Sequence, residues 1–176
     1  QVKFHLSKFE SLKLPENQKF DLILMAESFQ YLKLDAALKN CNQFLDKKGY
    51  VLICDYFRKH DNNYYKTTHV WQKFVESVEK HKFKIVYEED ITKYTLPTLT
   101  LGKSYYKQYV LPILEIISGY LSDKMPVISK IVSFVFYKKI NKIKYYLYQH
   151  TKEKLDETKF LENVCYKIIL LEKNII

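Results

Sequence analysis

Two apolar runs, with an amphipathic run between them, organise the first half of the chain. Residues 20–25 are almost all apolar, and residues 50–54 form a second β-rich run that ends at Asp55. Runs of this length are typical of strands buried on both faces of a parallel sheet. Residues 34–45 carry apolar side chains three and four positions apart, which predicts a helix with one apolar face. Together the three segments predict two parallel strands joined by a helical crossover.

Shorter patterns on either side of this unit extend the predicted sheet. Strand patterns occur in three further segments, namely residues 2–6, 83–87 and 166–171. The spacing of residues 69–80 predicts another helix, for which Thr67 and Thr68 are candidate caps. We expect a turn at Asp46 to Gly49, with Gly49 in the left-handed conformation that glycine adopts most readily. The elements up to residue 92 therefore alternate as in an α/β domain.

The pattern changes after Thr92. We expect Pro97 and Gly102 to break the chain before two long helical segments at residues 103–121 and 127–148. Pro112 and Gly119 are expected to kink or divide the first of these, Pro126 to start the second, and residues 152–163 to form a short helix. A helical block thus interrupts the series of strands before the last one.

Composition narrows the classes of protein to consider. The 176 residues are 47% hydrophobic and 28% charged, which is typical of a globular domain. The formal net charge of +9 suits an anionic membrane or nucleic acid, although abundant surface lysine explains it equally well. Cys41, Cys54 and Cys165 lack metal-binding spacing, so we expect reduced thiols and no metal site. With no signal peptide or membrane-spanning run, we expect a cytoplasmic protein, with membrane association left open.

The ordered series of segments resembles a known family. The stretches KFESLKLPENQKFDLILMAESFQYL, LDKKGYVLICDYF, FKIVYEEDIT and YKIILLEK are similar to successive parts of class I S-adenosylmethionine-dependent methyltransferases, in particular the sterol- and tocopherol-type group. The resemblance implies an α/β fold: a Rossmann-like, mostly parallel sheet whose last strand is antiparallel, with an inserted helical cap. It assigns residues 1–96 and 160–176 to the sheet domain and residues 97–159 to the cap.

One part of the family pattern is missing. The chain has only three glycines, so it contains no GxGxG loop of the kind with which the family holds its cofactor. The acidic residue that binds the cofactor ribose in the family is also absent. We therefore expect a truncated domain, a fragment that lacks about the first third of the fold and is inactive alone.

The resemblance implies S-adenosylmethionine as cofactor and places its contacts in two loops. Phe9 and Glu10 lie where the family contacts adenine, although Glu10 is equally suited to a capping or surface role. Ala26, Glu27 and Ser28 follow the central predicted strand, where ligands bind in such sheets. Glu27 would accept a hydrogen bond from the cofactor's amino group or position a substrate. Alternatively, Ser28 caps the next helix and Glu27 is an acidic residue at its start.

Catalytic and substrate-binding candidates lie near the second strand and in the helical block. Asp55 is a candidate general base if burial raises its pKa, and otherwise a turn-forming residue at a strand end. His60, in the following loop, is a second candidate base. Expected acceptor contacts are aromatic: Tyr31, Tyr56, Phe57, Tyr105, Tyr106 and Tyr109. Those in the helical block are also explained by helices that bury their apolar faces on the sheet.

These observations support two hypotheses about function. The first is methyl transfer from S-adenosylmethionine to a small, apolar acceptor molecule, aided by alignment and proton removal. The second is a non-catalytic, degenerate methyltransferase domain that binds a partner or a lipid surface. We expect no nucleic-acid partner, because the aromatic residues beside the lysines alternate with Ile, Val and Leu rather than forming an exposed stacking surface. The attacking atom and the oligomeric state stay open.

Overall fold

The computed structural model describes residues 2–124, 142, 145 and 151–174. The chain divides into two compact units, which we describe separately. The first unit combines Gln1–Lys93 with Glu162–Ile176, so the last strand returns to the amino-terminal part of the chain. Tyr94–Leu161 form the second unit, which contains the helices inserted between strands.

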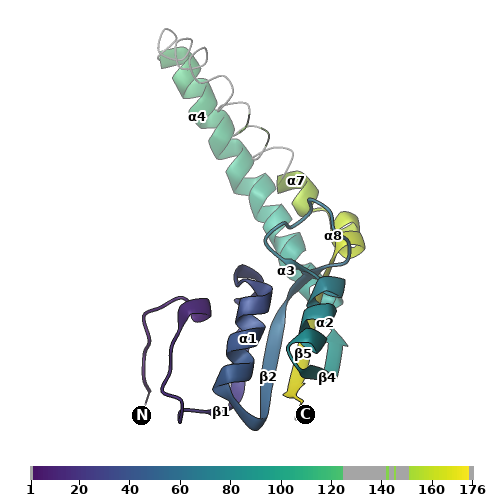
Figure 1. The fold of residues 1–176 in the computed structure, drawn as a ribbon. Helices are drawn as coiled ribbons and strands as arrows, with labels where there is room; N and C mark the ends of the chain where they lie inside the picture. Colours follow the sequence, from purple (N-terminus) through teal and green to yellow (C-terminus); the bar gives the residue numbers. More distant parts are fainter. Residues whose placement is uncertain (1, 125–141, 143–144, 146–150, 175–176) are drawn as a thin grey trace. The chain divides into compact units, whose positions relative to one another are not determined.

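A mixed sheet forms the centre of the first unit (Figure 1). Its strands are β1 (Phe20–Ala26), β2 (Leu45–Arg58), β3 (His69–Val70), β4 (Phe83–Asp90) and β5 (Val164–Lys173). The order is β1-β2-β5-β4, and the short β3 pairs with the end of β2. β1 and β3 run parallel to β2, whereas β5 runs antiparallel to both of its neighbours, β2 and β4. The predicted α/β sheet with an antiparallel last strand is confirmed.

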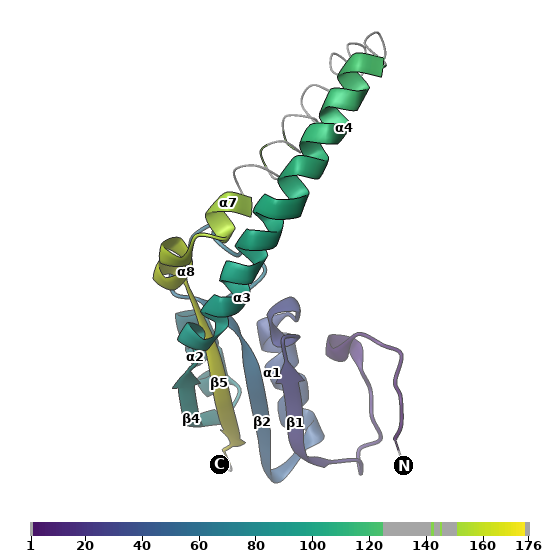
Figure 2. The same ribbon diagram turned by 180° about the vertical axis from the view of Figure 1, so that it is seen from behind.

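Helices α1 (Leu34–Phe44) and α2 (Trp71–Lys80) lie on the same face of this sheet, as Figures 1 and 2 show from opposite sides. From Gly49 onward, alternate residues of β2 point to this face, so this part of the strand alternates between buried and partly buried positions. The buried core combines side chains of both helices with those of the strands, including Leu38, Phe74, Val51, Ile53, Phe57 and Ile169. Burial of each such side chain contributes about 1.5–3 kcal/mol.

Gly49 is required for a different reason from the one predicted. Asp46 to Gly49 lie inside β2 and not in a turn, and no glycine among the described residues has a positive φ. The β1–β2 register shifts at this point, where Phe20 pairs with Leu45 but Leu22 pairs with Tyr50. A Cβ atom on Gly49 would lie 2.9 Å from Leu45 Cβ and 3.1 Å from the carbonyl oxygen of Phe20. Glycine is needed here because the backbone passes too close for any side chain.

Two local predictions in the first unit are wrong. Residues 2–6 form no strand, because none of the described strands pairs with them and an alternating pattern alone does not hold a strand. The predicted cap of α2 is also incorrect, since the helix begins at Trp71 with no side-chain cap. Thr68 instead donates its hydroxyl to the carbonyl oxygen of Tyr65, 2.9 Å away, and so closes the preceding loop.

The described part of the second unit is helical. It comprises most of α3 (Thr92–Tyr105), a π-helical turn (Tyr106–Val110), α4 (Leu111–Lys124), α7 (Thr151–Lys154) and most of α8 (Glu157–Asn163). Pro97 and Gly102 do not break the chain, because both lie within α3. Pro97 is the sixth residue of α3, so it removes one backbone hydrogen bond from the helix interior, and the backbone nevertheless stays helical on both sides of it. Among the described helices, none is long and apolar enough to cross a membrane.

The division predicted at Pro112 is not observed, because the backbone stays helical from α3 through the π-helical turn into α4 at Leu111. Gly119 lies within α4 and does not interrupt it. The predicted helix at 127–148 and its start at Pro126 lie outside the described residues, apart from 142 and 145. The predicted helix at 152–163 is two helices, because Asp156 accepts a hydrogen bond from the Lys159 amide (3.0 Å) and starts α8 anew.

Candidate functional site

The carboxyl ends of β1 and β2 lie side by side at one edge of the sheet. Ala26 pairs with Cys54, and the Glu27 amide donates a hydrogen bond of 2.9 Å to the Cys54 carbonyl oxygen. The sequence predicted this meeting of the Ala26–Ser28 and Asp55–Phe57 segments, and the structure confirms it. Ligands bind at such strand ends in open α/β sheets, so this edge is the candidate site.

Glu27 has an unusual backbone conformation at this edge. Its φ of 49° lies in the left-handed region, which non-glycine residues seldom adopt. Residues 26–28 are all exposed, so the strand end is open to a ligand. The Glu27 carboxylate accepts a hydrogen bond from the hydroxyl of Tyr166, with an O···O distance of 3.1 Å. Backbone strain of this kind is most common at functional sites.

Tyr166 comes from β5 and completes the cluster. Its side chain is 8% exposed, and its ring lies against that of Tyr56 with the centroids 4.3 Å apart. The Cys54 thiol donates to the Tyr166 hydroxyl oxygen at 3.3 Å, while that hydroxyl donates to Glu27. Burial, assisted by the hydrogen bond with Cys54, raises the Tyr166 pKa above its ordinary range. Tyr166 is therefore a protonated donor at all physiological pH values.

Sequence reasoning did not identify Tyr166, although a signal for it existed. β5 runs antiparallel to β2. Its first residues therefore lie beside the last residues of β2, at the candidate edge. The observed register pairs Tyr56 with Tyr166 accordingly. The strand prediction began at Tyr166, and its start should have been included in the site.

Asp55 is a buried structural carboxylate. Its exposed fraction is 0%, and it lies on the core face of β2 with Val51 and Ile53. Its two oxygens accept hydrogen bonds from the amides of Gln30 (3.0 Å) and Tyr56 (2.8 Å). Burial raises the pKa of Asp55, as the sequence analysis allowed, but no acceptor reaches a side chain without exposed atoms. The prediction of Asp55 as general base is therefore corrected: it anchors the turn after β1.

The histidine packed at this edge is His69 and not the predicted His60. His60 lies exposed in the loop after β2, and its carbonyl oxygen accepts a hydrogen bond from the Asn62 amide. His69 Nε2 lies 3.2 Å from the Phe29 carbonyl oxygen, and its ring contacts the Phe29 ring. Burial lowers the His69 pKa, which keeps this imidazole neutral. The catalytic role predicted for His60 stays a prediction.

The predicted substrate contacts differ in accessibility. Phe57 is completely buried against Trp71 and Phe74 of α2, so it is a core residue and its predicted substrate role is corrected. Tyr31 is 70% exposed, and Tyr56 is half-buried beside Tyr166. Tyr105, Tyr106 and Tyr109 belong to the second unit, where the rings of Tyr105 and Tyr109 stack with centroids 5.6 Å apart. The acceptor role of these exposed tyrosines stays a prediction.

The segment before β1 forms a short 3-10 turn at Phe9–Ser11. Asn40 of α1 donates to the Phe9 carbonyl oxygen at 2.7 Å, which fixes this turn against the helix. Glu10 accepts a hydrogen bond from the Lys33 amide at 3.1 Å, and backbone amide donors, its own first, lower its pKa. Of the two roles predicted for Glu10, the capping role is the one observed, at the start of α1.

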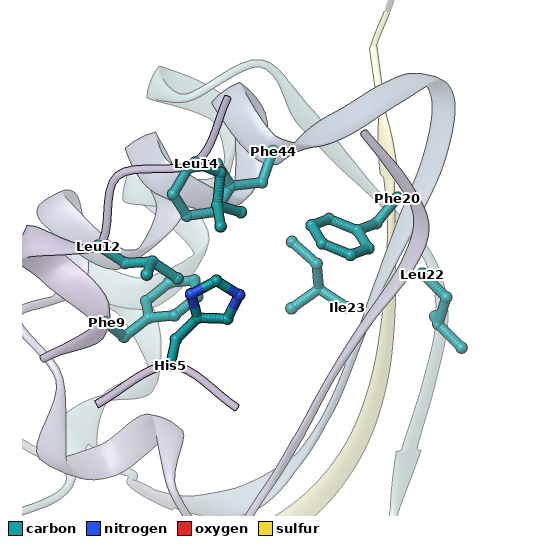
Figure 3. Close-up of a pocket in the computed structure, with 8 residues that line it drawn as sticks. All are labelled: His5, Phe9, Leu12, Leu14, Phe20, Leu22, Ile23 and Phe44. Carbon is teal, nitrogen blue, oxygen red and sulfur yellow. The ribbon is translucent and has the colours of Figure 1, made fainter. Parts of the chain in front are cut away.

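An apolar cavity of about 240 Å³ lies between this segment and β1 (Figure 3). It is lined by His5, Phe9, Leu12, Leu14, Phe20, Leu22, Ile23 and Phe44. These residues include the first half of β1, whereas the polar cluster lies beyond its last residue. The cavity offers an apolar surface but no cluster of polar groups, so it is separate from the polar cluster at Glu27, and Phe9, the predicted adenine contact, lies in its wall.

Comparison with known proteins shows which family part of the sequence matches and which solved structures share the fold. Residues 1–53 match the model of a family described as methyltransferase domain. Among curated proteins, no sequence matches this chain. The fold resembles that of an O-methyltransferase from a trans-AT PKS multienzyme of Brevibacillus brevis, solved with S-adenosyl-L-homocysteine: the TM-score is 0.60 and the identity 16%, over 98% of this chain and 50% of that one.

Two further solved structures have a similar fold. Geranyl diphosphate C-methyltransferase from Streptomyces coelicolor A3(2) gives a TM-score of 0.61 at 10% identity, over 96% of this chain and 53% of that one. The [4+2]-cyclase SpnF gives a TM-score of 0.56 at 15% identity, over 99% of this chain and 57% of that one. The chain thus spans about half the length of these proteins. It has an α/β fold of the methyltransferase type, and its first 53 residues match the methyltransferase domain family.

Proposed function

We propose that this chain forms part of an S-adenosylmethionine-dependent methyltransferase, and that the Glu27–Tyr166 pair lines its cofactor site. One observation carries this proposal. An exposed strand end in a strained conformation presents a carboxylate that a buried tyrosine holds in place. The match of residues 1–53 to methyltransferase domains and the S-adenosyl-L-homocysteine bound in a protein of similar fold support it.

The residues at this edge fit the chemistry of the cofactor. Ala26 is exposed and small, so a ligand can approach the backbone closely. The Glu27 carboxylate suits the ammonium group of the cofactor's methionyl part, because a charge-assisted hydrogen bond is stronger than a neutral one. Phe9 is partly exposed and offers an aromatic surface to the adenine ring. When bound, S-adenosylmethionine supplies an electrophilic methyl group on its sulfonium.

The protein's contribution is mainly to hold groups in place. Tyr166 fixes the Glu27 carboxylate, and Asp55 fixes the turn at Phe29–Tyr31 through the Gln30 amide. Fixed groups of this kind align reactants and so reduce the entropic cost of reaction. We propose a small acceptor molecule with an apolar part, which the exposed Tyr31 would contact. The similar fold of a geranyl diphosphate C-methyltransferase supports this class of acceptor.

A pair of matched substitutions tests the cofactor site. Glu27 and Glu172 each accept a hydrogen bond from a tyrosine hydroxyl at 3.1 Å, but only Glu27 lies at the candidate edge. We expect Glu27→Gln to raise the dissociation constant for S-adenosyl-L-homocysteine about tenfold, equivalent to about 1.4 kcal/mol. Glu172→Gln should leave it unchanged. NMR titration suits this measurement, because it detects weak binding. An equal effect of both substitutions, or no binding to the parent chain, would contradict the proposal.

A second candidate function is a non-catalytic binding module with the same fold. The lack of any GxGxG sequence in the 176 residues favours it, because that loop holds the cofactor in the family that the chain resembles. SpnF, described as a [4+2]-cyclase, shows that a similar fold occurs in a protein not described as a methyltransferase. Under this alternative, the chain binds no S-adenosyl-L-homocysteine, and Glu27→Gln changes stability alone.

A further inference from the structure

A threonine hydroxyl holds the backbone of Tyr166 at the point where β4 ends and α3 begins. The last residue of β4, Asp90, pairs with Lys167 of β5. The next residue, Ile91, therefore lies opposite Tyr166, and its amide donates to the Tyr166 carbonyl oxygen at 2.9 Å. In an antiparallel ladder, two residues paired in this way exchange a second hydrogen bond in return. Here the Tyr166 amide instead donates to Thr92 Oγ1, also at 2.9 Å.

The Thr92 hydroxyl takes the place of a backbone acceptor because the chain leaves the ladder here. α3 begins at Thr92, so its backbone is helical and no longer follows β5. Thr92 is 4% exposed and Tyr166 8% exposed, and a buried amide without an acceptor is costly. The Thr92 hydroxyl donates to the Asp90 carboxylate, which also accepts from the Thr92 amide at 3.0 Å. With its hydrogen directed at Asp90, the hydroxyl oxygen presents a lone pair to the Tyr166 amide.

Tyr166 connects this threonine to the candidate site. Its amide is bound to Thr92, and its hydroxyl donates to the Glu27 carboxylate with an O···O distance of 3.1 Å. The Tyr166 ring is buried and lies against the Tyr56 ring, so a shift of the Tyr166 backbone moves its hydroxyl as well. Thr92, Tyr166 and Glu27 thus form a continuous hydrogen-bonded series from the start of α3 to the end of β1.

We infer that Thr92 is a positioning residue of the proposed cofactor site: it fixes the backbone of Tyr166, whose hydroxyl fixes the Glu27 carboxylate. The inference rests on the proposed function, because it takes Glu27 as the residue that binds the cofactor. Positioning of this kind matters because a binding group held in one place loses less freedom when the ligand arrives. Since Thr92 is the first residue of α3, the geometry of the site depends on the point where the helical block begins.

Substitutions that remove or keep the Thr92 hydroxyl test this inference in the whole 176-residue chain. Thr92→Val should raise the dissociation constant for S-adenosyl-L-homocysteine about threefold, less than Glu27→Gln does, because the carboxylate is displaced and not removed. Thr92→Ser keeps the hydroxyl and should bind like the parent chain. Val78→Ala destabilises the core of the same unit and should leave binding unchanged. Unchanged binding by Thr92→Val, or equal weakening by Thr92→Val and Val78→Ala, would overturn the inference.

A double-substitution cycle with Tyr166→Phe separates positioning from a general loss of stability. Thr92→Val should weaken binding in the parent chain but add nothing once the Tyr166 hydroxyl is gone, because residues that act through one another are not additive. The same fold-change in both backgrounds would overturn the inference.

The NMR signal of the Glu27 amide gives the same comparison without ligand. Thr92→Val should shift this signal in the parent chain and leave it in place in Tyr166→Phe. A parent chain that binds no S-adenosyl-L-homocysteine would refute the proposed function, and the ligand-free cycle would still decide whether Thr92 positions Glu27. A shift in both backgrounds, or in neither, would show that it does not.

Discussion

The hydroxyl of Tyr166 is the most informative single group at the candidate site. Tyr166→Phe removes this hydroxyl but keeps the ring, and with it the contact to the Tyr56 ring at a centroid distance of 4.3 Å. Two interactions are lost, the hydrogen bond donated to Glu27 and the one accepted from the Cys54 thiol. The substitution therefore tests whether β5 holds the end of β1 in place.

The expected loss of stability follows from these two interactions. A hydrogen bond to a charged group contributes about 1.5–3 kcal/mol, and a neutral one about 0.5–1.5 kcal/mol. Because Glu27 is exposed to solvent, the lower end of the first range applies. The thiol of Cys54 is a weak donor and adds little. We expect the free energy of unfolding to fall by about 1–2 kcal/mol, and Tm by about 2–4 °C for each kcal/mol.

The pH dependence of stability tests the role of the Tyr166 hydroxyl in a second, independent way. The pKa of Tyr166 is raised in the folded state, so its contribution to stability is complete below the unfolded pKa of about 10. Above that pH the unfolded chain ionises while the folded tyrosine does not, and stability is lost as pH rises. The parent chain and Tyr166→Phe differ in their free energy of unfolding. This difference should therefore narrow above pH 10, by about 1.4 kcal/mol per pH unit.

Urea unfolding between pH 7 and 11, followed by circular dichroism, measures both effects. Tyr50→Phe is the control, because it removes a hydrogen bond of the same type between β2 and β5, to Glu172 and far from the candidate site. Tyr50→Phe should leave S-adenosyl-L-homocysteine binding unchanged, whereas Tyr166→Phe should weaken it. A Tyr166→Phe variant with unchanged stability and unchanged binding would refute the assignment of Tyr166 as the residue that positions Glu27.

Three further substitutions test the rest of the first unit. Gly49→Ala should destabilise the chain by about 1–3 kcal/mol in urea unfolding, because the new Cβ lies 2.9 Å from Leu45 Cβ. Phe74→Ala should cost about 3–5 kcal/mol by leaving a cavity between α2 and the sheet, and a loss below 1 kcal/mol would contradict its core position. The pKa of Asp35 is lowered to about 2, mainly by the hydrogen bond from the Ser77 hydroxyl. Its contribution to stability is therefore lost as pH falls, whereas that of Tyr166 is lost as pH rises. Asp35→Asn should be less stable than the parent at pH 6, and the difference should disappear as pH falls toward 2.

Much of the sheet could be predicted because its signal is local. The apolar runs that became β1 and the centre of β2, and the spacing that became α1, each specify one element without reference to the rest. Predictions failed where a distant contact decides the structure. Gly49 is required by the Phe20 carbonyl oxygen and Leu45, and no turn signal contains that information. Residues 2–6 have a strand pattern but no described strand beside them.

The position of the candidate site could be predicted from the sequence, but only some of the residues that form it could. The rule for parallel strands located the edge at Ala26–Ser28, because the chain direction of β1 follows from the crossover. The roles of Asp55 and Phe57 depend on which face of β2 they occupy, and an apolar run on both faces does not specify this. Tyr166 lies 139 positions from Glu27, and only the register of the antiparallel last strand brings them together.

A residue-resolved map of cofactor binding tests the proposed cofactor site most directly. Titration of the ¹⁵N-labelled chain with S-adenosyl-L-homocysteine should shift the amide signals of Ala26, Glu27 and Ser28 first, because these residues line the proposed cofactor wall. The same titration of Tyr166→Phe should need more ligand for equal shifts. Saturable shifts confined to the apolar cavity, around Leu12 and Phe44, or no saturable shifts at all, would contradict a cofactor site at the Glu27 edge.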